Sequence, residues 1–124
     1  MTQGYAELEG GRCLLALDGH ATGSPEMCAA ISGIVYALAG YLANAGRDGF
    51  AEVYRMELES GKVRIHCHGD DRVTAACEMA IIGLRQLEKA HPDLLQMDLQ
   101  EIFSFSGRNL RGVLIWSRCP PASP

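Results

Sequence analysis

A histidine and a cysteine eight residues apart form the pattern in this sequence that is best suited to covalent chemistry. His20 follows an apolar run, and Cys28 lies just after Ser24 and Pro25, where a helix is expected to begin. The positive end of a helix stabilises a thiolate, and a nearby imidazole can take the thiol proton and return it to a leaving amine. Unpaired amides of the first helical turn could also hold an oxyanion. A cysteine in an alanine-rich helix is also a common core residue, so the spacing alone leaves catalysis and packing both open.

The residues around this pair form a longer motif. The chain has Gly19-His20-Ala21, a glycine-containing loop, and then Cys28-Ala29-Ala30-Ile31-Ser32. This motif resembles the signature of the ribosomal processing cysteine protease family, Prp. A weaker match is Ile82-Gly83-Leu84 followed by Ala90-His91-Pro92, and the resemblance spans roughly residues 14–97.

The resemblance implies an activity, a substrate and a dimer. Cys28 matches the family's nucleophile and His20 its general base, with Gly19 and Ser32 at supporting positions. Members of the family form dimers and trim a short hydrophobic N-terminal extension from a bacterial large-subunit ribosomal protein. We therefore expect a homodimeric cysteine endopeptidase with such an extension as substrate, and we expect no cofactor and no metal. The alternative is a non-catalytic family member that acts as a ribosome-assembly binding module.

The sequence departs from the family pattern in three places, and the first two motivate that alternative. Pro25-Glu26-Met27 stands where the family usually has Asp-hydrophobic-hydrophobic, and Ser24 or Glu26 would take over at the helix start. The loop between His20 and Cys28 is shorter than in most members, and the C-terminal residues have no family counterpart.

The apolar periodicity predicts the elements that must position these residues. Strands are expected at residues 5–9, 13–18, 50–59, 62–68 and 94–103, and helices at residues 25–45, closed by Gly46, and 71–90. In the third strand, Val53, Arg55 and Glu57 would face one side and Tyr54, Met56 and Leu58 the other. Two tandem strand–strand–helix units predict an α+β fold, a two-layer sandwich with a mainly antiparallel sheet covered by two helices. We assign residues 1–103 to a Prp-like domain and residues 104–124 to a C-terminal extension, an edge strand plus a disordered tail.

Residues 27–46 carry no charge and have the length of a membrane span. Because many of these residues are alanine or glycine, we interpret the segment as a core helix and expect no membrane partner. Ala30, Gly33, Ala37 and Gly40 form a stripe of small residues on this helix. Internal packing is the favoured interpretation of the stripe, and a helix contact in a dimer is the other.

Other groups that could do chemistry are weaker. His66 and His68 share a strand face and could bind zinc, but no recognisable partner set accompanies them. Asp18 could orient His20. Cys77 is expected in the core, Cys13 and Cys67 in strands, and Cys119 in the tail.

Composition limits the compartment and the partners. The 124 residues carry a formal net charge of −4, which argues against a nucleic-acid partner. Five cysteines cannot all pair within one chain, and the first residues lack a secretion-signal pattern. Reduced thiols and a cytoplasmic location are the expectation.

Overall fold

The apolar patterns along the chain form strands and helices in the predicted order. We analysed a computed structural model of the protein, which describes residues 1–99, 104–105 and 108–109. Its elements are β1 (Thr2–Glu9), β2 (Arg12–Asp18), α1 (Pro25–Asp48), β3 (Ala51–Glu59), β4 (Lys62–Gly69), α2 (Asp71–Ala90), β5 (Leu95–Leu99), β6 (Ser104–Phe105) and β7 (Arg108–Asn109). Residues 100–103 of the predicted last strand lie outside the described residues.

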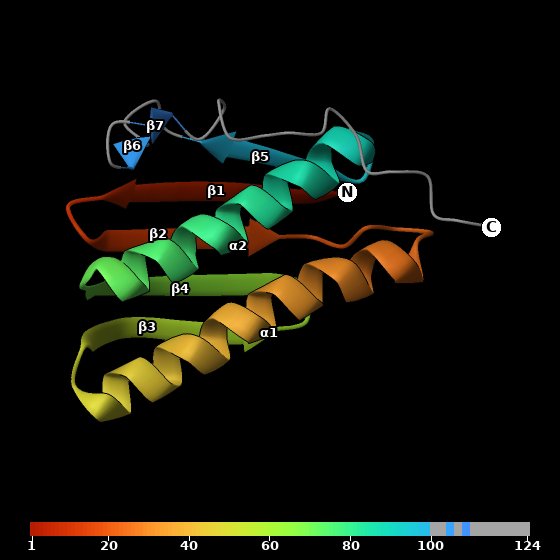
Figure 1. Ribbon diagram of the computed structural model, residues 1–124. Helices are drawn as coiled ribbons and strands as arrows, with labels where there is room; N and C mark the ends of the chain where they lie inside the picture. The colour runs from red at the N-terminus through yellow and green to blue at the C-terminus, as the bar shows by residue number, and fades with distance from the viewer. Residues whose placement is uncertain (100–103, 106–107, 110–124) are drawn as a thin grey trace.

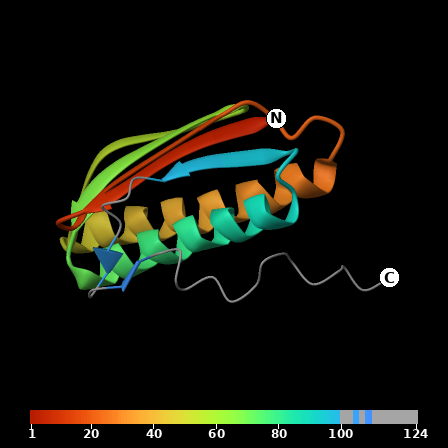
Figure 2. The same cartoon turned by 90° about the horizontal axis from the view of Figure 1, so that it is seen from above.

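The first five strands form one sheet in the order β3-β4-β2-β1-β5. The pairs β3–β4, β4–β2 and β2–β1 are antiparallel, and β1–β5 is parallel. Both helices lie on the same face of this sheet, so the molecule has two layers (Figures 1 and 2). The predicted α+β class, with a mainly antiparallel sheet and two covering helices, is confirmed.

The core lies between the helices and the sheet. Its largest fully buried side chains are Leu15, Leu42, Ile65, Ile81, Leu84 and Leu95. Burying one such side chain contributes about 1.5–3 kcal/mol. By length and composition alone α1 could cross a membrane, but its buried residues, such as Ile31 and Val35, belong to this core.

Helix α1 runs three residues further than predicted and ends at Asp48 rather than before Gly46. Gly49 takes the left-handed conformation at the helix end, with φ of 89°, and its N–H bonds to carbonyl groups of the last turn. The prediction placed the helix end at Gly46, the first glycine after the apolar pattern. The end is instead set by the glycine whose left-handed conformation turns the chain into β3.

The predicted faces of β3 are wrong at Val53 and Tyr54. The register with β4 shifts between Val53 and Arg55, which puts Val53 on the core side with Met56. Tyr54 is exposed and lies against the His66 ring, with 5.0 Å between centroids. A bulge of this kind breaks simple alternation because one strand carries an extra residue.

The expected internal packing of the small-residue stripe is also wrong for most of its members. Gly33, Ala37 and Gly40 are exposed, because the buried residues of α1 point toward the sheet from the other side of the helix. Gly33 and Ala37 instead line an apolar groove of about 600 Å³ between α1 and α2, together with the exposed Met79. The alternative, a dimer contact, stays a prediction.

Beyond β5, only β6 and β7 are described, and they pair with each other rather than with the main sheet. The rest of the predicted extension 104–124, including its apolar run at residues 113–116, lies outside the described residues.

Candidate active site

The position of His20 is set by the pairing of β2 with β4, because His20 comes two residues after the end of β2. Asp18 at the end of β2 lies opposite Lys62 at the start of β4, and the Gly19 N–H donates to the Gly61 carbonyl at 2.9 Å. Gly19 has φ of 94°, and a Cβ there would collide with the Met1 carbonyl oxygen. A residue with a side chain would be strained at this turn, so Gly19 supports the site through its backbone.

The imidazole of His20 lies over Gly61 in the β3–β4 turn. A Cβ at Gly61 would come within 2.7 Å of His20 Nε2, and Gly61 has φ of 74°. The ring therefore occupies space that only glycine leaves open. The sequence identified Gly61 as a turn residue and missed its contact with His20, because that contact depends on a strand register that no local pattern reveals.

Ser24 caps α1 and fixes the first turn that carries Cys28. Its Oγ accepts from the Met27 N–H at 3.2 Å, and its carbonyl accepts from the Cys28 N–H at 3.1 Å. Pro25 has no N–H. Within the described chain this leaves Glu26 with the one unbonded amide among these first four helical residues, fewer free donors than the sequence suggested.

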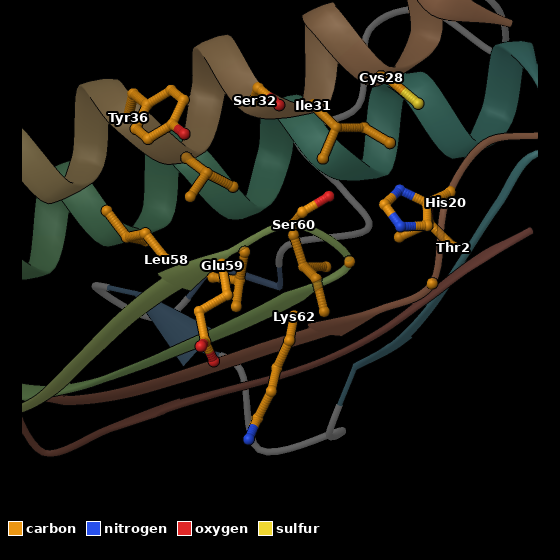
Figure 3. A pocket seen from close by; sticks show the side chains of 15 residues that line it. Thr2, His20, Cys28, Ile31, Ser32, Tyr36, Leu58, Glu59, Ser60 and Lys62 are labelled. Atoms are coloured by element: carbon orange, nitrogen blue, oxygen red, sulfur yellow. The ribbon is translucent and has the colours of Figure 1, made fainter.

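Cys28 and His20 line the same cavity, whose volume is about 320 Å³. The cavity lies between α1 and the β3–β4 turn, and Figure 3 shows both side chains in it. Ile31, Val35 and Leu58 contribute apolar walls. The lining therefore combines apolar walls with polar side chains that include His20 and Lys62.

Ser32 lies one helical turn after Cys28 and lines this cavity. In the described part of the chain its hydroxyl makes no side-chain hydrogen bond, so it does not bond back to the Cys28 carbonyl. The hydroxyl is exposed and free to meet a bound molecule.

The Cys28 thiol donates a weak hydrogen bond to the Ala21 carbonyl at 3.7 Å, and among the described residues no bond joins it to His20. Asp18 does not orient the imidazole as suggested, because both of its carboxylate oxygens accept from Arg64 Nη2, at 3.0 and 2.9 Å. His20 is thus exposed and positioned mainly by its backbone and by Gly61.

Two charged residues of the β3–β4 hairpin, Lys62 and Glu59, line the cavity. Lys62 Nζ pairs with Glu57 Oε2 at 3.5 Å. Hydrogen bonding from Arg55 lowers the pKa of Glu57, which keeps that carboxylate charged.

The suggested zinc set around His66 and His68 is not assembled. The two histidines alternate with Cys67, which is fully buried on the helix-covered face. Cys67 instead meets Cys13 and Cys77, with the three sulfur atoms within 4.8 Å of one another. Sequence patterns placed each of these cysteines correctly in a strand or the core but did not reveal that they meet.

No protein-family model matches the chain, and no curated protein matches it. Among solved structures, the S. aureus ribosomal processing protease Prp with a covalently linked product peptide matches with a TM-score of 0.66 at 13% identity, over 81% of this chain and 100% of that one. SMU.848 from Streptococcus mutans matches with a TM-score of 0.61 at 22% identity, over 81% of this chain and 94% of that one.

A second S. aureus Prp structure, in complex with a substrate peptide, matches with a TM-score of 0.59 at 11% identity, over 81% of this chain and 100% of that one. At these identities the likeness concerns the fold. The resemblance inferred from the motif is thereby confirmed in three dimensions: this chain has the fold of the ribosomal processing protease Prp.

Proposed function

We propose that this protein is a cysteine endopeptidase in which Cys28 is the nucleophile and His20 the general base. The observation that carries the proposal is the meeting of these two side chains in one cavity, from a strand end and a helix start. The fold is shared with a protease whose structures hold a product or substrate peptide.

The geometry supports a sequence of proton transfers at named atoms. His20 takes the Cys28 thiol proton, and the sulfur attacks the scissile carbonyl carbon, so that a C–S bond forms as the carbonyl π bond opens. The developing oxyanion faces the positive end of α1, where the Glu26 amide is free. His20 then protonates the leaving amine, the C–N bond breaks, and a thioester remains. Water, deprotonated by His20, hydrolyses the thioester and regenerates the thiol.

The resting structure requires one adjustment before this chemistry. The thiol donates to Ala21, so a bound peptide has to draw the sulfur away from that carbonyl and toward His20. Catalytic hydrogen bonds are often long or absent without substrate and tighten in the complex.

The cavity walls and the shared fold support a proposal for the substrate class. We propose a short, hydrophobic N-terminal extension of a bacterial large-subunit ribosomal protein, held extended between α1 and the β3–β4 turn. Ile31, Val35 and Leu58 would receive its apolar side chains, and Ser32 would offer a hydroxyl to its backbone.

Cleavage of a synthetic peptide tests the proposal. The peptide copies the N-terminus of the host's own ribosomal protein, and products are identified by mass spectrometry. Cys28→Ala and His20→Ala should each reduce cleavage by about 10³-fold or more. Cys119→Ala, which removes a thiol outside the described residues, is the matched control and should cleave like the wild type.

Two results would overturn the proposed protease activity. One is no cleavage by the wild type, and the other is equal cleavage by Cys28→Ala. Peptide binding without cleavage would favour the alternative, a ribosome-assembly binding module.

The homodimer and the cytoplasmic location are further parts of the proposal. The exposed apolar groove that contains Gly33 and Met79 supports a contact between two copies. Light scattering after size exclusion should give twice the chain mass, and Gly33→Asp should shift it toward the monomer.

A further inference from the structure

Three cysteines that the peptide chemistry does not use form a cluster under α2. Cys13 and Cys67 are direct partners across β2 and β4, and Cys77 lies on the buried face of α2. All three are fully buried, and their sulfur atoms lie within 4.8 Å of one another. The Cys67 and Cys77 sulfurs are 4.0 Å apart.

This spacing is that of ligands around one metal ion. With metal–sulfur bonds of about 2.3 Å, a planar three-sulfur site has its sulfurs about 4.0 Å apart. The Cys67–Cys77 separation meets this value, and the remaining pairs lie within 4.8 Å, less than 1 Å above it. The register of β2 and β4 positions Cys13 and Cys67, and the packing of α2 positions Cys77. All three candidate ligands therefore lie on regular elements rather than on loops, which favours a precise site.

The donors select the class of ion. Thiolates favour soft ions such as Cu(I) and zinc, and structural zinc sites take four ligands. Among the described residues the cluster has three candidate ligands, and its sulfurs are closed to water. His66 and His68 alternate with Cys67 along β4, and His66 lies against Tyr54 on the other face. A soft ion that accepts three ligands therefore fits better than zinc.

We propose that Cys13, Cys67 and Cys77 bind one Cu(I) ion, or a similar soft monovalent ion, in a trigonal three-sulfur site. Each thiol that coordinates releases its proton to solvent, and the ion keeps its oxidation state. The bound ion joins β2, β4 and α2 and stabilises the folded chain by linkage. The site is separate from Cys28, because α2 and α1 begin at opposite ends of the sheet (Figure 1). It does not depend on the proposed protease.

Copper loading of the full chain tests this site. Reduced protein is titrated with Cu(I) under anaerobic conditions against a chromophoric Cu(I) chelator, and a second sample is refolded with Cu(I) present. We expect about one copper per chain and, by X-ray absorption, three sulfur ligands at about 2.3 Å. The midpoint of thermal unfolding should rise on loading.

Matched variants locate the ligands. Cys13→Ala, Cys67→Ala and Cys77→Ala should each bind less than about one fifth of the wild-type copper after desalting, while Cys28→Ala and Cys119→Ala should bind it fully. Circular dichroism identifies any variant that fails to fold, and the wild-type coordination number then decides.

Three outcomes would overturn the site. The first is no copper bound by the wild type after titration and after refolding. The second is loss of copper in Cys28→Ala or Cys119→Ala, and the third is a sulfur count other than three.

Discussion

Cys28 and the buried trio of Cys13, Cys67 and Cys77 place the same functional group in opposite surroundings. Cys28 lies in the first turn of α1, beside a cavity and in contact with a backbone carbonyl. The trio lies between sheet and helix with no exposed surface, and the Cys67 and Cys77 sulfurs are 4.0 Å apart. The difference indicates that the position of a thiol makes it accessible for the proposed peptide chemistry at Cys28, or buries it for packing and the proposed metal site.

The protonation of two of the three buried thiols sharpens the contrast, whereas hydrogen bonds from Cys13 and Cys77 lower the pKa of the third, Cys67. The pKa of Cys13 is raised to about 12, first by its hydrogen bond with Cys67 and then by burial. The pKa of Cys77 is raised as well, by hydrogen bonds with Cys13 and Cys67 and by burial. In the metal-free protein both groups are therefore protonated near neutral pH, and they are poor nucleophiles.

The largest expected effect is a difference in thiol accessibility. In the folded, metal-free protein at neutral pH, iodoacetamide should modify Cys28 about 10³-fold or more faster than Cys13 and Cys77, because the buried thiols react only when the chain opens. Peptide mapping by mass spectrometry gives the rate at each site. Denaturant should remove the difference, and similar rates in the folded protein would break the comparison.

The next effect is expected at the glycine under His20. Gly61→Ala should reduce kcat/KM for peptide cleavage by about tenfold or more, because the added Cβ displaces the imidazole. Gly10→Ala is the matched control. Gly10 also has a positive φ, 58°, in the β1–β2 turn, but a Cβ there meets nothing within 4 Å.

Both substitutions should lower the free energy of unfolding by about 1–3 kcal/mol through backbone strain, measured by urea denaturation. Only Gly61→Ala should slow cleavage. An equal loss of cleavage in the two variants would show that Gly61 acts through stability alone.

The smallest expected effect is at the cap of α1. Ser24→Ala should lower the free energy of unfolding by about 1 kcal/mol and reduce cleavage a few-fold, because the Met27 amide loses its acceptor in the turn that holds Cys28. Ser24→Asp restores an acceptor and should recover most of the stability. Chemical denaturation of the wild type and the two variants measures the free energy of unfolding. An unchanged value in Ser24→Ala would contradict the role of Ser24 as a cap.

Local signals in the sequence were sufficient for the order of the elements, and the resemblance of one motif was sufficient to propose His20 and Cys28 as site residues. Ser24 and Pro25 mark the start of α1, and the Gly-His and Cys motifs fall at the ends of adjacent elements. The structure places His20 and Cys28 in one cavity, and their catalytic roles stay a prediction. The cysteine trio could not, because residues 13, 67 and 77 meet only through strand pairing and helix packing.

The errors have two physical origins. The end of α1 depends on which glycine takes the left-handed conformation, and the faces of β3 depend on a bulge. Asp18 was assigned to His20 by simple alternation, while its ion pair with Arg64 comes from a neighbouring strand. The helix end is set by a local cap, whereas the faces of β3 and the ion pair of Asp18 are set by pairing with β4, which no pattern within a single element reveals.

The central claim is that His20 activates Cys28, and the rate of Cys28 alkylation at about pH 6.5 tests it most directly. The rate is measured in the wild type, in His20→Gln and in His91→Gln, which removes an exposed histidine at the end of α2. Activation predicts at least about a tenfold slower reaction in His20→Gln and no change in His91→Gln. Equal rates in all three proteins would contradict the claim and leave Cys28 an ordinary, partly buried thiol.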